Sequence, residues 1–162
     1  MYYVLMVCTG NICRSPMAAG LASYFLPQAL QDRVQISSAG VSALHGNPAE
    51  PNAKAAMSGL DIDISSHRAR QITGELAGRV DLILTMEIMQ RAMVRRMLFW
   101  KNAKVRLLTD YCPQSHEPDI KDPYGGPLQA YQDCLDTLVP CVKALITWLE
   151  TEADIPAAPS SP

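Results

Sequence analysis

The sequence predicts an α/β fold with three layers, in which a four-stranded parallel sheet is flanked by helices. Short, strand-like apolar segments alternate along the chain with longer helix-like segments, the order expected for a parallel sheet with right-handed crossovers. The segment over 80–86 is nearly all apolar, as a strand covered on both faces should be. The 162 residues are about the length of one domain. These observations together favour one sheet with helices on both faces.

Hydrophobic patterns and breaker residues place the elements in order. The predicted strands are short runs rich in apolar residues: 3–8, 34–38, 80–86 and 104–108. The predicted helices are the longer segments: 16–30, 51–59, 87–98 and 128–150. We expect Ser15 to cap the first helix, Pro16 to lie in its first turn and Pro140 to kink or divide the last one. The Pro/Ala/Ser-rich tail over 153–162 is expected to be disordered, which leaves a domain over 1–152.

The most informative segment joins the first strand to the first helix and reads Cys8-Thr9-Gly10-Asn11-Ile12-Cys13-Arg14-Ser15. A strand–loop–helix unit directs loop amides and the positive end of a helix at one point, which makes an anion site. A cysteine at that point is favoured as the thiolate, which is a nucleophile. Arg14, six residues after Cys8, supplies a planar guanidinium that can bind two phosphate oxygens at once. The octapeptide therefore predicts a nucleophile, an anion cradle and a clamp.

This string resembles the Cys-x5-Arg signature of protein tyrosine phosphatases, and with Pro16 it resembles the low-molecular-weight family in particular. The resemblance extends over residues 2–150 and implies the flavodoxin-like phosphotyrosine phosphatase I fold. It implies hydrolysis of phosphotyrosine through a phosphocysteine on Cys8, with Arg14 as a second catalytic residue. The residues expected to bind the phosphate group are Thr9, Gly10, Asn11, Ile12 and Cys13.

A long loop after the fourth predicted strand carries a second motif. Residues 109–127 show neither strand nor helix periodicity, and loops of this length in compact domains are usually functional or disordered. Within it, Asp122-Pro123-Tyr124-Gly125 resembles the general-acid motif of the family. An aryl oxide leaves poorly without a proton, and the same carboxylate can then activate the water that breaks the phosphocysteine. Three other acidic residues share the loop, and only the motif favours Asp122 over them: Asp110, Glu117 and Asp119.

The resemblance also implies residues that support the loop. In the family, the asparagine inside the loop and the serine after the arginine join a second serine and a histidine in a hydrogen-bond network. The matching residues here are Asn11, Ser15, Ser38 and His67. Asparagine tolerates the left-handed backbone conformations of a tight loop better than most residues. Ser15 can donate to the thiolate, and His67 is expected to give structural support rather than to transfer a proton.

Two positions depart from the animal members of the family. Leu44 or His45 stands where those enzymes place a tryptophan, and Gly125 stands where they have a second tyrosine after Tyr124. Fewer aromatic side chains are therefore available to hold the ring of the substrate, as in bacterial members. Leu44 and Tyr124 are expected to line the substrate site. Ile12 occupies a position at which an arginine-phosphatase branch of the family carries threonine. Its apolar, β-branched side chain favours the aromatic ring of phosphotyrosine.

Three other functions stay open at this point. A protein-arginine phosphatase is the first, and a phosphoprotein-binding module without turnover is the second, although Cys8, Arg14 and Asp122 together argue against the module. A thiol-dependent arsenate reductase shares the fold and a similar anion loop but needs a relay of two further cysteines. Cys134 and Cys141 are seven residues apart on the last predicted helix, not after the third strand where the relay belongs.

Composition limits the partners and the location. The net charge of −2 gives no reason to expect nucleic acid or a membrane as partner. No apolar run approaches the roughly 20 residues needed to cross a bilayer, and no signal peptide is recognisable. Five cysteines are an odd number without the density of a disulfide scaffold, so a reduced, cytoplasmic protein is expected. No second Cys/His pair completes a zinc site with Cys8 and Cys13, so neither metal nor cofactor is expected. The expected partners are oxyanions and phosphotyrosine proteins, and the resemblance suggests a bacterial tyrosine autokinase among them.

Overall fold

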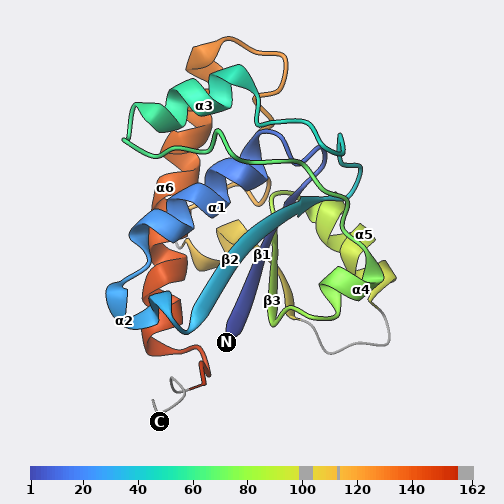
Figure 1. Ribbon diagram of the computed structural model, residues 1–162, viewed down its shortest axis with the longest axis vertical. Helices are drawn as coiled ribbons and strands as arrows, with labels where there is room; N and C mark the ends of the chain where they lie inside the picture. The colour runs from blue at the N-terminus through green and yellow to red at the C-terminus, as the bar shows by residue number, and fades with distance from the viewer. Residues whose placement is uncertain (99–103, 113, 157–162) are drawn as a thin grey trace.

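Figure 1 shows a computed structural model of the chain, which describes residues 1–98, 104–112 and 114–156. A parallel sheet of four strands runs through the molecule in the order β2-β1-β3-β4. Its strands are β1 (Tyr2–Cys8), β2 (Val34–Gly40), β3 (Leu82–Thr85) and β4 (Lys104–Leu107). The predicted fold class is confirmed. The carboxyl ends of the strands meet at one edge of the sheet, and β1 ends there at Cys8.

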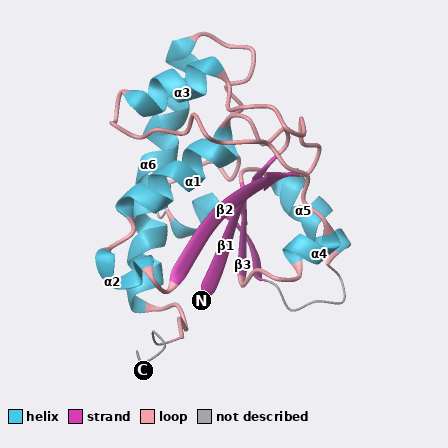
Figure 2. Cartoon of the chain, in the orientation of Figure 1, coloured by secondary structure: helices cyan, strands magenta, loops and turns pink. Residues whose placement is uncertain are grey.

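Helices lie on both sides of this sheet (Figures 1 and 2). On one side are α1 (Arg14–Phe25), α2 (Gln28–Gln31), α3 (Pro51–Ser58) and α6 (Leu128–Thr151). On the other side are α4 (Gly74–Ala77) and α5 (Ile88–Met97). A 3-10 helix, η1 (Leu108–Tyr111), follows β4 directly. The short α4 and η1 were not predicted, because four residues are too few to show a helical period.

Alternating side chains of β1 enter two separate hydrophobic cores. Val4 and Met6 pack into the core beneath α1 and α6, whereas Leu5 and Val7 pack into the core beneath α4 and α5. All four side chains are fully buried. Burying one such side chain contributes about 2 kcal/mol, so the central strand is firmly held on both faces. Cys8 therefore stands at the end of a strand that is held on both faces.

The first predicted helix, 16–30, is wrong at both ends. The helix α1 begins at Arg14 with Cys13 as its N-cap residue, so Ser15 lies in the first turn and is not the cap. It ends at Phe25, because Leu26 precedes Pro27 and adopts an extended conformation. The ring of a proline disfavours helical backbone in the residue before it. A separate short helix, α2, starts only after Pro27.

Pro140 does not divide α6, which is a continuous helix from Leu128 to Thr151. The proline removes one backbone hydrogen bond, but Leu138, Cys141 and Val142 around it are buried in the core and hold the helix in place. No helix in the part of the chain that the structure describes combines the length and hydrophobicity needed to span a membrane.

Ordered contacts extend beyond α6 into the predicted tail. Ile155 is buried, and the Arg33 guanidinium donates hydrogen bonds to the carbonyl groups of Ile155 (2.8 Å) and Pro156 (2.9 Å). The remainder of that tail, 157–162, lies outside the described residues.

Candidate active site

The loop between β1 and α1 turns its carbonyl groups outward. The carbonyls of Cys8, Thr9, Gly10 and Ile12 accept hydrogen bonds of 2.9 to 3.0 Å from the N–H groups of Val41, Ser42, Leu44 and Glu50, in that order. The carbonyl of Asn11 accepts from Nε2 of His67 at 2.6 Å. In a trans peptide the N–H and C=O groups point in opposite directions. The N–H groups of the loop are therefore directed inward, which makes a concave anion site.

Gly40 allows the loop to lie this close to β2. A Cβ atom added at Gly40 would stand 2.4 Å from the carbonyl oxygen of Thr9 and 3.1 Å from Cβ of Asn11. Any side chain there would push the loop away from the sheet. The segment over 40–50 thus shapes the outside of the anion site. The sequence predicts this segment only as a connecting loop, because backbone-to-backbone contacts leave little signal in residue types.

The buried Asn11 side chain connects the loop to its surroundings. Asn11 has the left-handed φ of +58°, and its Nδ2 donates to Oγ of Ser15 (2.8 Å) and of Ser38 (3.0 Å). Its Oδ1 accepts from the backbone N–H of Arg70 at 2.8 Å. The structure thus brings Asn11, Ser15, Ser38 and His67 together. Because Asn11 is completely buried, its side chain braces the loop from behind and does not line the cavity.

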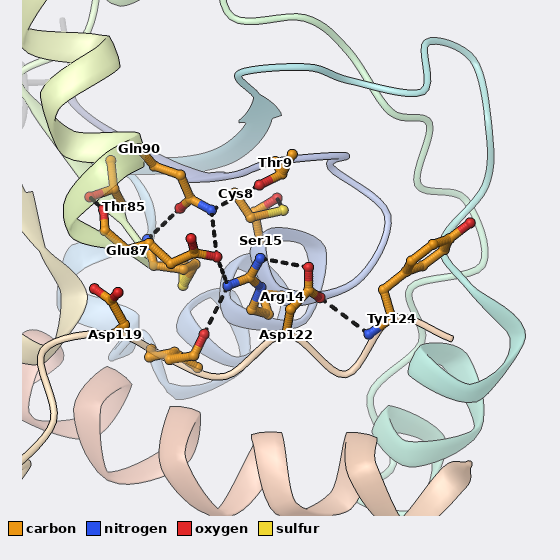
Figure 3. Close-up of polar contacts among 12 residues, drawn as sticks. Cys8, Thr9, Arg14, Ser15, Thr85, Glu87, Gln90, Asp119, Asp122 and Tyr124 are labelled. Atoms are coloured by element: carbon orange, nitrogen blue, oxygen red, sulfur yellow. Dashed lines mark hydrogen bonds and ion pairs between the residues drawn. The ribbon is translucent and has the colours of Figure 1, made fainter. Parts of the chain in front are cut away.

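Cys8 and Ser15 are in direct contact. Oγ of Ser15 lies 3.0 Å from Sγ of Cys8 (Figure 3). A thiolate carries no hydrogen, so the Ser15 hydroxyl is the donor whenever Cys8 is ionised.

Arg14 is buried among acidic and carbonyl groups (Figure 3). Its Nη1 donates to the Glu87 carboxylate and, at 2.8 Å, to the carbonyl of Ile120, and its Nη2 lies 2.8 Å from Oδ2 of Asp122. Hydrogen bonding to Glu87 and the charges of Asp122 and Glu87 raise the pKa of Arg14 despite its burial, which alone would lower the pKa. Nε is buried without a partner among the described residues. A buried donor without a partner is costly, so it is a natural contact for an oxyanion.

Of the four acidic residues in the loop after β4, Asp122 is the one that faces Arg14 and the cavity. Asp119 instead accepts a hydrogen bond of 2.8 Å from the N–H of Ile88 at the start of α5. Asp110 accepts from the N–H of Leu107 at 3.0 Å. Glu117 does not line the cavity. The geometry therefore distinguishes Asp122 from the other acidic residues of this loop. In the sequence, only the motif Asp122-Pro123-Tyr124-Gly125 makes that distinction.

Above the loop lies a cavity of about 260 Å³. Its lining residues are Cys8, Thr9, Gly10, Ile12, Cys13, Arg14, Ser42, Leu44, Asp122 and Tyr124. Leu44 and Tyr124 are exposed at its rim, Tyr124 with 60% of its surface accessible. Ser42 was not predicted, and His45 does not line the cavity. The result is a polar, anion-binding floor with apolar groups at the entrance.

Sequence reasoning also missed Glu87 and Gln90. Glu87 follows β3 at the carboxyl edge of the sheet, and Gln90, which is 2% exposed, lies in the first turn of α5. Their position just beyond a buried strand, where ligands of parallel sheets bind, was the available signal. Among the described residues, no group of three or more His, Cys, Asp or Glu side chains is arranged to hold a metal ion.

The remaining cysteines lie in different environments from Cys8. Burial raises the pKa of Cys13 to about 12, and its Sγ lies 3.6 Å from the hydroxyl of Tyr131. Burial likewise raises the pKa of Cys134 and of Cys141 to about 12. Both lie on α6 with their side chains packed in the core. They are therefore thiols on a rigid helix, which does not suit a mobile disulfide relay.

Comparison with known proteins identifies the family. A family model described as low molecular weight phosphotyrosine protein phosphatase matches residues 3–154. The chain is 41% identical over 149 residues to a probable low molecular weight protein-tyrosine-phosphatase, EpsP, of Ralstonia nicotianae, covering 88% of this chain and 97% of that protein. It is 33% identical over 151 residues to a protein-arginine-phosphatase of Geobacillus stearothermophilus, covering 93% and 98%.

A solved structure agrees with these matches. The tyrosine phosphatase AmsI of Erwinia amylovora superposes with a TM-score of 0.80 at 29% identity, covering 90% of this chain and 91% of that chain. The fold, the position of the Cys8 loop at the sheet edge and the sequence matches agree. The chain belongs to the low molecular weight phosphotyrosine protein phosphatase family.

Proposed function

We propose that this protein hydrolyses phosphotyrosine in proteins through a phosphocysteine on Cys8. The observation that carries the proposal is the convergence on one cavity of Cys8, Arg14 and Asp122. The inward-facing loop amides and the unpartnered Nε of Arg14 supply the donors that a phosphoryl group needs. The 41% identical relative is named as a probable tyrosine phosphatase, which supports the same reaction.

The first step transfers the phosphoryl group to sulfur. The Cys8 thiolate attacks phosphorus, the P–S bond forms and the P–O bond to the tyrosyl oxygen breaks. Asp122, protonated, gives its proton to the leaving oxygen. In the free enzyme Asp122 is paired with Arg14 at 2.8 Å. A bound phosphate dianion takes over the guanidinium, which releases Asp122 for this task.

The second step restores the enzyme. The Asp122 carboxylate accepts a proton from a water molecule, whose oxygen attacks phosphorus. The P–S bond breaks, inorganic phosphate forms and Cys8 leaves as the thiolate. The Ser15 hydroxyl, 3.0 Å from Sγ, stabilises that leaving group.

The entrance of the cavity favours an aromatic leaving group. Ile12 and Leu44 form an apolar wall beside the loop, and Tyr124 offers a ring at the rim. A flat tyrosyl ring gains more from such contacts than a charged guanidino group does. The proposed partners are phosphotyrosine proteins, and the family resemblance adds a bacterial tyrosine autokinase in the cytoplasm as the candidate substrate.

Arginine dephosphorylation is the second candidate, because the arginine phosphatase of Geobacillus stearothermophilus is 33% identical over nearly the whole chain. Initial rates on two peptides that differ only in phosphotyrosine or phosphoarginine separate the candidates. We expect the phosphotyrosine peptide to be the better substrate, and Ile12→Thr to shift the ratio towards phosphoarginine. A wild-type preference for phosphoarginine would reverse the assignment.

The reaction itself is tested with an aryl phosphate. Cys8→Ser should retain binding of inorganic phosphate yet lose essentially all turnover, because an unactivated serine is a poor nucleophile. Cys112→Ser, the same change at a buried cysteine outside the cavity, should keep turnover and serves as the matched control. Substantial hydrolysis by Cys8→Ser would rule out the covalent mechanism.

A further inference from the structure

Gln90 lies beside the active site without lining its cavity. Its carboxamide is buried and makes three hydrogen bonds (Figure 3). Oε1 accepts from the backbone N–H of Met86 at 3.0 Å. Nε2 donates to Oγ1 of Thr9 at 3.1 Å and to Oε1 of Glu87 at 3.2 Å. A buried amide with its oxygen and both amide hydrogens engaged has one favoured orientation.

The backbone fixes which end of this amide faces the active site. The N–H of Met86 can only donate, so the carboxamide oxygen must face it. The NH2 group is therefore directed at Thr9 and Glu87. An ionised Glu87 carboxylate can only accept hydrogen bonds, so it also requires the NH2 group of Gln90 to face it. These neighbours fix the orientation of the Gln90 amide. With the amide flipped, its NH2 group would face the N–H of Met86 and its oxygen would face the Glu87 carboxylate.

The two acceptors connect to two different parts of the phosphate site, the loop and Arg14. Thr9 directly follows Cys8 in the loop, and its backbone carbonyl already accepts from the N–H of Ser42 at 3.0 Å. Glu87 is the carboxylate that pairs with Nη1 of the buried Arg14. Thr85 donates to the backbone carbonyl of Glu87 at 3.3 Å, but this contact does not hold the carboxylate.

We propose that Gln90 is a positioning residue for phosphate binding, which braces the Thr9 side of the loop and the Glu87–Arg14 pair through one carboxamide. The Glu87 side chain is 29% exposed, so without the Nε2 donor it can turn towards water. Arg14 then loses a partner that orients its guanidinium. This inference rests on the proposed function, in which Arg14 binds the phosphoryl group.

The test separates phosphate binding from proton donation. Gln90→Met keeps the size of the side chain but removes all three hydrogen bonds. We expect it to weaken binding of inorganic phosphate, measured by calorimetry, by about tenfold, the effect of losing an oriented hydrogen bond to a charged group. The kcat/KM for aryl phosphates should fall by a similar factor. Its dependence on the leaving group should stay as in the wild type, in contrast to Asp122→Asn.

A second pair of variants tests the loop side without changing a core residue. Thr9→Val has nearly the same shape but lacks the acceptor, whereas Thr9→Ser keeps it. We expect Thr9→Val to weaken phosphate binding about threefold, in the lower range for one neutral hydrogen bond, and Thr9→Ser, which retains the hydroxyl, to weaken it less than Thr9→Val does. Because Thr9 acts through Gln90, the double variant Thr9→Val/Gln90→Met should bind phosphate no more weakly than Gln90→Met.

Gln129→Met is the matched control, since Gln129 is exposed on α6 and its amide donates to Asp133. It should bind phosphate as the wild type does. The proposal is overturned if folded Gln90→Met binds phosphate with wild-type affinity. If Gln90→Met fails to fold, wild-type affinity in Thr9→Val overturns it instead. Calorimetry measures phosphate binding and needs no turnover. A failure of the Gln90 proposal therefore appears in the phosphate affinities of the variants, whereas a failure of the proposed reaction appears as absent hydrolysis by the wild type.

Discussion

The loop over 8–15, proposed to bind phosphate, and the segment over 119–124, which carries the proposed acid Asp122 and is called the acid segment, meet at Arg14, but they are held in different ways. In the loop, Asn11, Arg14 and Ser15 are at most 1% exposed, and the carbonyls of residues 8–12 all have partners. In the acid segment, the side chain of Asp122 is 45% exposed and Tyr124 is still more open. The first region is part of the core, whereas the second is anchored there by Ile120, which is 1% exposed, and presents Asp122 and Tyr124 at the surface.

The acid segment is attached at a few points. The N–H of Ile120 donates to the carbonyl of Met86 at 2.8 Å, and Asp119 accepts from the N–H of Ile88. The Ile120 side chain is buried in the core, and Arg14 donates to both the Ile120 carbonyl and the Asp122 carboxylate. In the proposed mechanism, binding and covalent chemistry therefore use a preorganised site. Proton delivery would use a carboxyl group on the exposed part of an anchored segment, which leaves the entrance open.

The largest effect expected from this comparison tests the role of the acid segment. Asp122→Asn should slow hydrolysis of aryl phosphates with poor leaving groups by about a hundredfold, the range expected for a lost general acid. Substrates whose leaving groups need no proton should be affected less. The measurement is kcat against the pKa of the leaving phenol for the wild type and the variant.

Asp119→Asn is the matched control, three residues away in the same segment. Asp119 contacts the start of α5 and not Arg14, so its variant should keep the leaving-group dependence of the wild type. If Asp119→Asn shows the steeper dependence and Asp122→Asn does not, the assignment of the acid is wrong.

The second prediction compares the stability of the two regions. Asn11→Ala removes the partners of the Ser38 hydroxyl and the Arg70 N–H and places alanine at a left-handed φ. It should lower the free energy of unfolding by about 2 kcal/mol, since buried polar groups lose their partners. Tyr124→Ala, at the exposed rim, should change it by about 0.5 kcal/mol or less. Urea denaturation measures both, and equal losses would remove the proposed difference between the regions.

The sequence predicted the loop better than the acid segment for a physical reason. In the loop the residue types follow from local geometry: Asn11 adopts a left-handed φ, and Arg14 and Ser15 lie in the first turn of a helix that directly follows a buried strand. The alternation of strands and helices was likewise enough to predict the sheet and its layers. Helix ends were less predictable, because Cys13 caps α1 through its backbone conformation and without a side-chain hydrogen bond.

Contacts between distant segments could not be predicted from local patterns. Glu87 and Gln90 lie more than 70 residues from the loop they contact, and neither belongs to a recognised motif. Asp119 and Asp122 could be separated by motif alone, since both lie in an irregular, proline-containing loop. At Pro140 a local pattern predicted too much. The proline predicts a kink or a break, but burial of the surrounding residues keeps α6 continuous.

A third prediction concerns oxidation of the loop. Peroxide converts the Cys8 thiolate to a sulfenic acid, and the neighbouring Cys13 thiol can condense with it to a disulfide with loss of water. Burial keeps Cys13 protonated, with a pKa of about 12, so it is the partner and not the first target. Cys13→Ser should keep nearly full activity but recover less of it with a thiol reductant after peroxide treatment. Peptide mass spectrometry that linked Cys8 to Cys112, Cys134 or Cys141 would contradict this pairing.

The smallest expected effect is a pH dependence of stability from the loop support. Burial, with the charges of Arg68 and Arg70, lowers the pKa of His67 below its ordinary 6.5, although its hydrogen bond to Asn11 opposes this. The unfolded state then binds more protons than the folded state. The contribution is complete above pH 6.5 and is lost as the pH falls towards the folded-state value. In His67→Gln the free energy of unfolding should lack this part of the pH dependence, whereas an unchanged slope would show that His67 is not responsible.

The phosphocysteine is the central claim, and it can be observed directly. Asp122→Asn is incubated with an aryl phosphate whose leaving group needs no proton, quenched in acid and analysed by peptide mass spectrometry. Loss of the base that activates water should let the intermediate accumulate, so a phosphoryl group is predicted on the peptide that contains Cys8, located on Sγ. A phosphoryl group on another residue, or turnover with none on Cys8 at any time, would contradict the account.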